Sequence, residues 1–487
     1  MKMPAIAKPK LGINSGELVR ELGVSHATSI VVGTIIGSGI FLVPAEMMQA
    51  VGSAKLVYLA WLVGGLLSFF GALTYAELGA MKPEAGGEYV YLRDGYGPLA
   101  GFLYAWTWFL IAKPASIATI TTGMVRILGN FEAFSFVTRN FITAPIAITY
   151  GQLVAIAATI LISVLNYLGV KKAGEFQLVF TMLKVAMVLL IVAAGFSYAG
   201  GSWANFRTIH VGAMGGVGGF MAALVASLWA YDGWNDLNMV AGEVRRPERS
   251  VPIALIAGVA TVAALYILVN AAVQYVLPAS AIAASPRPAS QAMSLALGMV
   301  GASIVSAGMG LSMLVTLNGT IMSGARVPFA LARDGYFFKV LAEVHPRFHT
   351  PSVAILVQGD LVHCAAVVWG NLSAIIFPDD FCGMALLYVS YQHNIRFPEA
   401  RTERSSSLSD LGISASSGIV HHGFGGAALL HFCTEFTEFA HRYSGNLGWH
   451  TYFLYLQTAA DGVIRVNCRV LRDNHRPIGG VPCSTGW

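Results

Sequence analysis

Long apolar runs separated by short polar segments form the main pattern along the first three quarters of the chain. A run of about 18 or more apolar residues is long enough to cross the hydrocarbon layer of a membrane as a helix. We therefore expect eight spans and a weaker ninth, at residues 28–50, 54–81, 99–125, 145–169, 175–199, 216–242, 251–277, 300–325 and 351–377. The pattern predicts an all-α, polytopic membrane protein.

Composition excludes a water-soluble protein and argues against a nucleic-acid partner. Hydrophobic residues make up 55% of the chain and charged residues only 11%, whereas soluble domains contain about 25% charged residues. The net charge of +5 is spread over short loops and does not form one basic patch. We expect the lipid bilayer to surround the chain and no nucleic acid to bind it.

The distribution of Lys and Arg between the loops predicts how the chain is oriented. If the N-terminus is cytoplasmic, the inside segments hold 15 Lys and Arg and the outside loops hold five. Short cytoplasmic loops carry an excess of these residues in membrane proteins. We expect residues 1–27 to be a cytoplasmic segment and the chain to be a multi-pass protein of a bacterial inner membrane.

The chain changes character near residue 360, where the expected transporter core, 28–359, ends. All five Cys and eight of the twelve His lie beyond this point, and no Lys follows Lys339. Asp360 and His363 are expected to interrupt the ninth run, and no later run is long enough to span. Region 360–487 is either a soluble domain or, as we favour, a frame-shifted or disordered end. No CxxC or HxxxH spacing in it supports a metal site.

The first span contains glycines at the depth where a membrane helix is usually most regular. Gly37 and Gly39 lie in the segment Gly33 to Phe41 and weaken helix propensity. A helix break at membrane depth is tolerated only where it is surrounded by protein or lies beside a cavity. The glycines therefore predict a binding site lined by protein near the middle of the membrane. Alternatively, Gly33 and Gly37 form a GxxxG pair for close helix packing.

A second span is interrupted at Trp229 to Asp236, where a glycine and two acids fall inside an apolar run. Two such breaks in corresponding halves indicate a transporter built from inverted repeats. Half-helix N-termini attract a carboxylate and opposing carbonyls can hold an ammonium, which suits a zwitterionic amino acid. Trp229 could close over the substrate. Asp232 could face the substrate or, as we favour, cap the half-helix.

Two lysines lie inside apolar spans, where a central charge costs roughly 2.5–3.5 kcal/mol on insertion scales. Lys184 lies about ten residues into the fifth span. Its ammonium could release a proton during transport, or it could stay charged and occupy the site that a sodium ion fills in related pumps. Alternatively, it has only a structural role and donates hydrogen bonds to carbonyls at a helix end. Lys113 in the third span could be another residue of the transport pathway. We leave it unassigned, because it could equally snorkel or pair with an acid.

Five motifs in order resemble the L-type amino acid transporter family of the amino acid, polyamine and organocation superfamily, in its bacterial branch. They span residues 33–41 (GTIIGSGIF), 83–98 (PEAGGEYVYLRDGYGP), 229–234 (WAYDGW), 243–252 (EVRRPERSVP) and 318–335 (NGTIMSGARVPFALARDG). The resemblance covers residues 15–359. After Gly359 the family's later spans are not recognisable.

The resemblance implies a LeuT-like inverted repeat in which helices one and six are broken. It implies that Ile36, Gly37, Ser38 and Gly39 bind the substrate carboxylate. It also implies that the second break supplies carbonyls for the substrate amino group and that the Trp229 indole acts as a gate. The residues of this break are Trp229, Ala230, Tyr231, Asp232 and Gly233. Lys184 would stand where sodium-coupled relatives bind their ion. Some eukaryotic members pair with a glycoprotein through a cysteine, but no Cys precedes Cys364, so we expect no disulfide-linked partner.

The resulting hypothesis is a secondary transporter that moves amino acids by alternating access, as an exchanger or with protons. No cofactor is expected. The alternatives are an inactive remnant of such a carrier and a carrier of polyamines or other organic cations, which Asp232 and Asp236 would suit. An enzyme is not expected, because the sequence contains no P-loop, HExxH or GxSxG motif.

Overall fold

The computed structural model describes residues 16–129, 131–142 and 148–376, and the structural statements below concern these residues. The expectations for residues 377–487 lie outside the described residues, as do those for residues 1–15.

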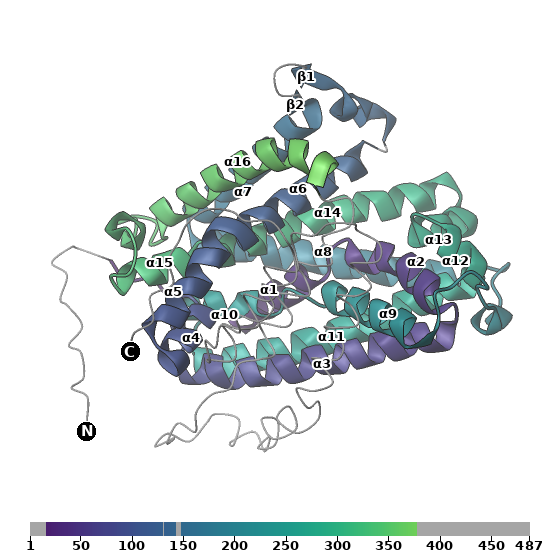
Figure 1. Ribbon diagram of the computed structural model, residues 1–487, viewed down its shortest axis with the longest axis horizontal. Coiled ribbons are helices and arrows are strands. Elements are labelled where there is room, and N and C mark those ends of the chain that lie inside the picture. The colour runs from purple at the N-terminus through teal and green to yellow at the C-terminus, as the bar shows by residue number, and fades with distance from the viewer. Residues whose placement is uncertain (1–15, 130, 143–147, 377–487) are drawn as a thin grey trace, which may run out of the picture. The chain divides into compact units, whose positions relative to one another are not determined.

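The described chain is mostly helical, in the order drawn in Figure 1. The helices and strands are α1 (Val24–Ile35), α2 (Gly39–Val51), α3 (Ala54–Met81), α4 (Glu88–Tyr96), α5 (Pro98–Thr107), η1 (Trp108–Ala112), α6 (Lys113–Leu128), η2 (Glu132–Thr138), β1 (Asn140–Ile142), β2 (Ile148–Thr149), α7 (Tyr150–Tyr167), α8 (Val170–Phe196), η3 (Trp203–Arg207), α9 (Gly216–Ala230), α10 (Asp236–Met239), η4 (Ala241–Glu243), α11 (Pro247–Val276), α12 (Ala279–Ala284), α13 (Pro288–Leu297), α14 (Met299–Gly324), α15 (Arg326–Arg333), η5 (Lys339–Ala342) and α16 (Ser352–Ile376).

The predicted membrane spans are confirmed as helical segments. Seven segments among the described residues are long and apolar enough to cross a membrane: Val24–Val51, Ala54–Met81, Pro98–Leu128, Tyr150–Tyr167, Val170–Phe196, Pro247–Val276 and Met299–Arg333. Shorter apolar helices cover Gly216–Ala230 and Ser352–His363. These are the span predicted to be interrupted and the span predicted to be weak.

The first and sixth spans are broken where the sequence predicted. Helix α1 ends at Ile35, because Ile36 leaves the helical region with ψ of 87°, and α2 begins at Gly39. Helix α9 ends at Ala230, and a turn leads to α10 at Asp236. Gly33, by contrast, lies within α1 and serves close packing: a Cβ there would lie 2.5 Å from side-chain atoms of Gln177 and Thr181. The two interpretations of the glycines therefore apply to different residues.

The broken helices lie at the centre of the arrangement, between two groups of long helices (Figure 1). Helices α3 and α11 run side by side and pack extensively on each other, and α11 also packs on α1. On the other side, α14 packs on α6, while α16 packs on α6 and α7. Helix α8 contacts α1, α11 and α14. Side chains from both groups can therefore reach the two breaks.

Helix α16 corrects one expectation. Asp360 and His363 do not interrupt the ninth apolar run, because the helix continues from Ser352 through both residues to Ile376. The reason is that single polar residues on one side of a helix leave its backbone hydrogen bonds intact. The boundary predicted at residue 360 thus falls inside a helix, and the domain division itself remains a prediction.

Candidate functional site

The two helix breaks contact each other directly. The Thr34 hydroxyl on α1 donates to the carbonyl of Gly233, with 2.8 Å between the oxygens. Gly233 has a φ of +109°, which favours glycine, and a Cβ there would lie 3.2 Å from Thr34. At Gly39, a Cβ would lie 3.3 Å from Ala230 and from the Trp229 indole. The residues predicted from two distant motifs therefore lie side by side.

Tyr266 on α11 holds the ends of both broken helices together. Its buried hydroxyl lies 2.9 Å from the Ile35 carbonyl oxygen and 2.9 Å from that of Ala230. These carbonyls are at helix C-termini, where intrahelical partners are missing. Tyr266 could not be predicted from the sequence, because one tyrosine in an apolar span is a common packing residue and its two partners lie far away in sequence.

Lys184 binds the carbonyl end of the first half-helix. Its ammonium donates to the carbonyl oxygens of Gly33 at 2.8 Å and Ile36 at 2.7 Å, and its side chain is fully buried. Two hydroxyls from α14 reach the same carbonyls: Thr316 lies 3.2 Å from Gly33 and Ser312 lies 2.6 Å from Ile36. Each carbonyl thus accepts two hydrogen bonds, which is the capacity of its two lone pairs. Ser312 and Thr316 were also missed by sequence reasoning.

The predicted site residues differ in exposure. Gly37, Ser38, Trp229 and Gly233 are partly exposed, and Asp232 is exposed. Backbone N–H groups at the start of α2 lack helical partners. The Gly37 N–H already donates to the Ile35 carbonyl at 2.8 Å, so the donors for an anionic group come from Ser38 and the first residues of α2. The remaining predicted residues, Ile36, Gly39, Ala230 and Tyr231, are buried.

One side chain in the second break is placed differently from the role that we favoured. Helix α10 has Asn235 as its N-cap, with no side-chain capping bond, so the capping role predicted for Asp232 is wrong. The turn of five residues after α9 moves the helix start beyond the reach of this carboxylate. Tyr231 is buried and its ring packs against Trp61 and Tyr266. The role predicted for Tyr231 belongs to its backbone carbonyl, so that role stays a prediction.

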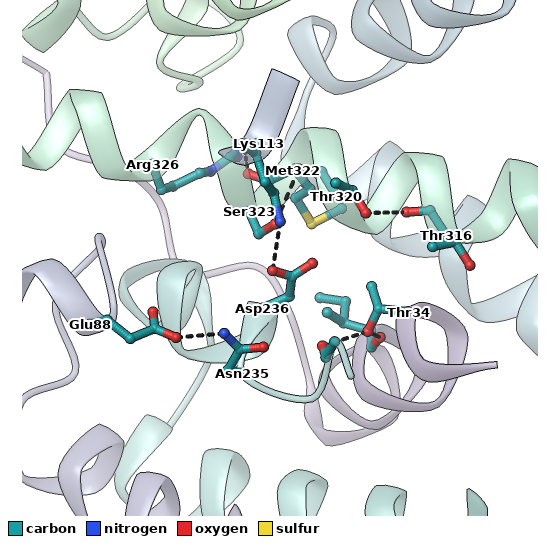
Figure 2. Close-up of polar contacts among 12 residues, drawn as sticks. Thr34, Glu88, Lys113, Asn235, Asp236, Thr316, Thr320, Met322, Ser323 and Arg326 are labelled. Atoms are coloured by element: carbon teal, nitrogen blue, oxygen red, sulfur yellow. Dashed lines mark hydrogen bonds and ion pairs between the residues drawn. The ribbon is translucent and has the colours of Figure 1, made fainter. Parts of the chain in front are cut away.

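A buried ion pair links the third span to the broken sixth span. The Lys113 ammonium lies 2.7 Å from Asp236 Oδ1, and both side chains are about 5% exposed (Figure 2). The ammonium also lies 4.9 Å from the centre of the Trp108 ring. Nearby, the Asn235 amide donates to Glu88 at 2.6 Å, which is also drawn in Figure 2. Of the two options for Lys113, the structure shows pairing with an acid.

A second buried pair joins the segment after α10 to the end of the eighth span. Arg326 is bidentate to Glu243, with N–O distances of 2.8 and 3.0 Å, and also donates to the Met322 carbonyl at 2.7 Å. Both side chains of the pair have no exposed surface. Both residues lie in the quoted motifs, but the motifs alone do not show that they meet.

Outside the spans, a charged cluster ties α4 to the end of α15. Arg93 pairs with Asp94 and Asp334, and the Tyr89 hydroxyl lies 2.7 Å from Asp334 Oδ2. Lys82 lies 2.9 Å from Asp94. Burial alone would raise the pKa of the Asp94 carboxyl, but hydrogen bonds from Arg93 and Lys82 hold that pKa below its usual range. The carboxylate therefore stays ionised and the cluster stays intact at neutral pH.

Within the described ranges, no group of three or more His, Cys, Asp or Glu could hold a metal ion. The chemistry of the site is instead that of backbone carbonyls, N–H groups and a few buried charges. Such a site can bind and release a charged small molecule, and nothing in its geometry prepares a nucleophile.

Comparisons with known proteins agree with this geometry. The profile of a family described as amino acid permease matches residues 22–388. The human b(0,+)-type amino acid transporter 1 is 34% identical over 373 residues, 74% of this chain and 72% of that protein. The serine/threonine exchanger SteT of Bacillus subtilis is 33% identical over 346 residues, which are 70% of this chain and 75% of that protein.

The solved structure of MhsT in complex with L-phenylalanine matches with a TM-score of 0.53 and 14% identity. The match covers 77% of this chain and 87% of that one. At this identity the likeness shows the fold alone. It confirms the LeuT-like arrangement with broken first and sixth helices.

Proposed function

The chain belongs to the amino acid permease family, and from this premise we propose that it exchanges amino acids across a bacterial inner membrane by alternating access. One observation carries the proposal most directly, namely that the two helix breaks touch and leave Gly37 and Ser38 partly exposed and Asp232 exposed. The N–H groups before α2 suit the substrate carboxylate, and the carbonyl end of α9 suits its ammonium. The membrane location of the chain follows from its family and its apolar helices.

We propose Ile36, Gly37, Ser38 and Gly39 as the carboxylate side of the site. The side that binds the substrate ammonium consists of Trp229, Ala230, Tyr231, Asp232 and Gly233. The indole of Trp229 lies against the start of α2, which supports a gating role. Lys184 is proposed to replace a coupling sodium ion, because it and two hydroxyls already fill the carbonyl lone pairs of Gly33 and Ile36. The N-terminus is proposed to be cytoplasmic, and no disulfide-linked partner is expected.

Exchange into proteoliposomes tests this function. Labelled neutral amino acids should enter vesicles preloaded with unlabelled ones, and Gly37→Leu should reduce this exchange at least 100-fold, by about 3 kcal/mol of barrier. A Cβ at Gly37 would meet nothing closer than the Ile35 carbonyl oxygen at 4.0 Å, so the variant should fold. Its side chain would then fill the space that the substrate needs.

The matched control is Gly218→Leu, on the exposed face of α9, where a Cβ would meet no atom within 4 Å. It should exchange at the unmodified rate. If neither the unmodified chain nor the control exchanges any amino acid although both insert and fold, the chain is an inactive remnant. If Gly37→Leu exchanges normally, the site lies elsewhere.

The exposed carboxylate of Asp232 favours a second candidate substrate class. Asp236 is paired with Lys113, whereas Asp232 is exposed at the break and adds a negative charge there. We propose that the carrier accepts amino acids with a cationic side chain in addition to neutral ones. The same negative charge would attract a polyamine, so polyamines stay a candidate substrate class.

Asp232→Asn should therefore weaken competition by lysine or arginine about fivefold, which corresponds to the roughly 1 kcal/mol of an exposed charge pair. Competition by a neutral amino acid should stay within about twofold, since backbone groups bind the shared headgroup. Competition assays with lysine, leucine and putrescine on the same vesicles measure this difference. Equal losses for all three compounds would contradict a side-chain role for Asp232.

A further inference from the structure

The amide of Gln358 on α16 is buried and has no hydrogen-bond partner among the described residues. Its side chain is 1% exposed, and neither its nitrogen nor its oxygen has a hydrogen-bond partner among the described residues. Leaving a buried polar atom unpaired costs about 1–3 kcal/mol. Nearly all such atoms in folded proteins are bonded to protein or to ordered water. Since the described residues supply no partner for either atom, ordered water is the partner to consider for both.

The Gln358 amide lies beside the side chain of Lys113. Both approach the same face of Gly324 on α14: a Cβ there would lie 2.6 Å from Lys113 Cγ and 2.9 Å from both amide atoms of Gln358. The ammonium of Lys113 has three donors. Within the described part of the chain, its contacts are Asp236 and the ring of Trp108. The buried ammonium thus has donors to spare, and the stem of the same side chain lies near the unpaired amide.

A third polar group faces the same turn of α16. The Ser163 hydroxyl on α7 is buried and, among the described residues, has no hydrogen-bond partner. A Cβ at Gly359, the residue after Gln358, would lie 3.8 Å from this hydroxyl oxygen. Polar groups from α6, α7 and α16 therefore gather around one turn of α16.

The chemistry of these groups selects the bound molecule. Gln358 presents a donor and an acceptor, so its partner must both accept and donate. A metal cation would satisfy only the oxygen and would be repelled by Lys113, and an anion would satisfy only the nitrogen. Water does both, and a buried water typically makes about three hydrogen bonds.

We propose that ordered water lies between Gln358, Ser163 and Lys113 and makes Gln358 a positioning residue for the Lys113–Asp236 pair. Lys113 belongs to the group of helices around α14 and α16, whereas Asp236 belongs to the broken sixth span. Water at Gln358 keeps the ammonium solvated when the broken span moves away. This role rests on the proposed transport function, whereas the water site itself does not.

The water site is tested without transport. A crystal or cryo-EM structure of the unmodified chain, at a resolution that shows ordered water, should contain density beside the Gln358 amide. Gln358→Met keeps the volume and removes both polar atoms, so it should lose this density and lower the melting temperature. Absence of density in the unmodified chain, or a higher melting temperature in the variant, would overturn the proposal, because a dry amide is a cost that methionine removes.

The positioning role is tested by exchange. Gln358→Met should reduce the maximal exchange rate about tenfold, or roughly 1.4 kcal/mol, while the substrate concentration for half-maximal exchange stays nearly unchanged. Gln358→Asn retains both polar groups and leaves room for one more water, so it should restore most of the rate. Leu356→Met, on the exposed side of the same helix, is the matched control. Unchanged exchange in Gln358→Met, with active unmodified protein, would contradict the positioning role alone.

Discussion

Arg326→Met is expected to destabilise the folded chain by about 3–5 kcal/mol, because it leaves the Glu243 carboxylate buried without its ion pair. Neither side chain has exposed surface, so water cannot replace the lost guanidinium. Such a loss is a large part of the roughly 5–15 kcal/mol that holds a typical protein folded. The yield of monodisperse protein in detergent and its melting temperature measure the effect.

A double variant distinguishes the contribution of the ion pair to stability from the contribution of the packing of its two side chains. Replacing both Arg326 and Glu243 with methionine removes the buried charges together, and such replacements are often neutral. The double variant should therefore recover most of the lost stability. Arg333→Met, seven residues later on the exposed side of α15, is the matched control and should have little effect. A stable Arg326→Met protein would show that the pair does not hold this part of the fold.

Lys184→Met is expected to reduce exchange about 100-fold. The variant loses two charge-assisted hydrogen bonds to the carbonyls of Gly33 and Ile36, each worth about 1.5–3 kcal/mol. Loss of about 3 kcal/mol from the conformation that transports corresponds to this change in rate. Ser312 and Thr316 still bind the same carbonyls, so the break should persist in the variant. The exchange assay in proteoliposomes, with insertion confirmed, measures the rate.

Lys172→Met on the exposed start of α8 is the control for loss of a lysine from this helix. It should leave exchange unchanged. A proton role for Lys184 also predicts that the pH dependence of exchange changes in its variants. Full activity of Lys184→Ala with the pH dependence unaltered would exclude both the positioning and the proton role.

Most of the fold could be predicted from the sequence, because span formation and helix interruption are local. An apolar run of sufficient length has few alternatives to a membrane helix, and glycines at 37 and 233 weaken a helix wherever it lies. The breaks near Gly37 and Gly233 were therefore predicted at the right positions. Local signals also misled: Asp360 and His363 do not end α16, and Asp232 does not cap α10.

The sequence by itself thus determined the class of protein, its spans and the two broken helices that carry the site. The tertiary structure alone decided which side chains satisfy those breaks. Lys113 meets Asp236, Glu243 meets Arg326, and Tyr266 joins Ile35 to Ala230 across separations that no local pattern encodes. The physical reason is that a break only frees hydrogen-bonding groups. Which donor reaches them depends on how distant helices pack.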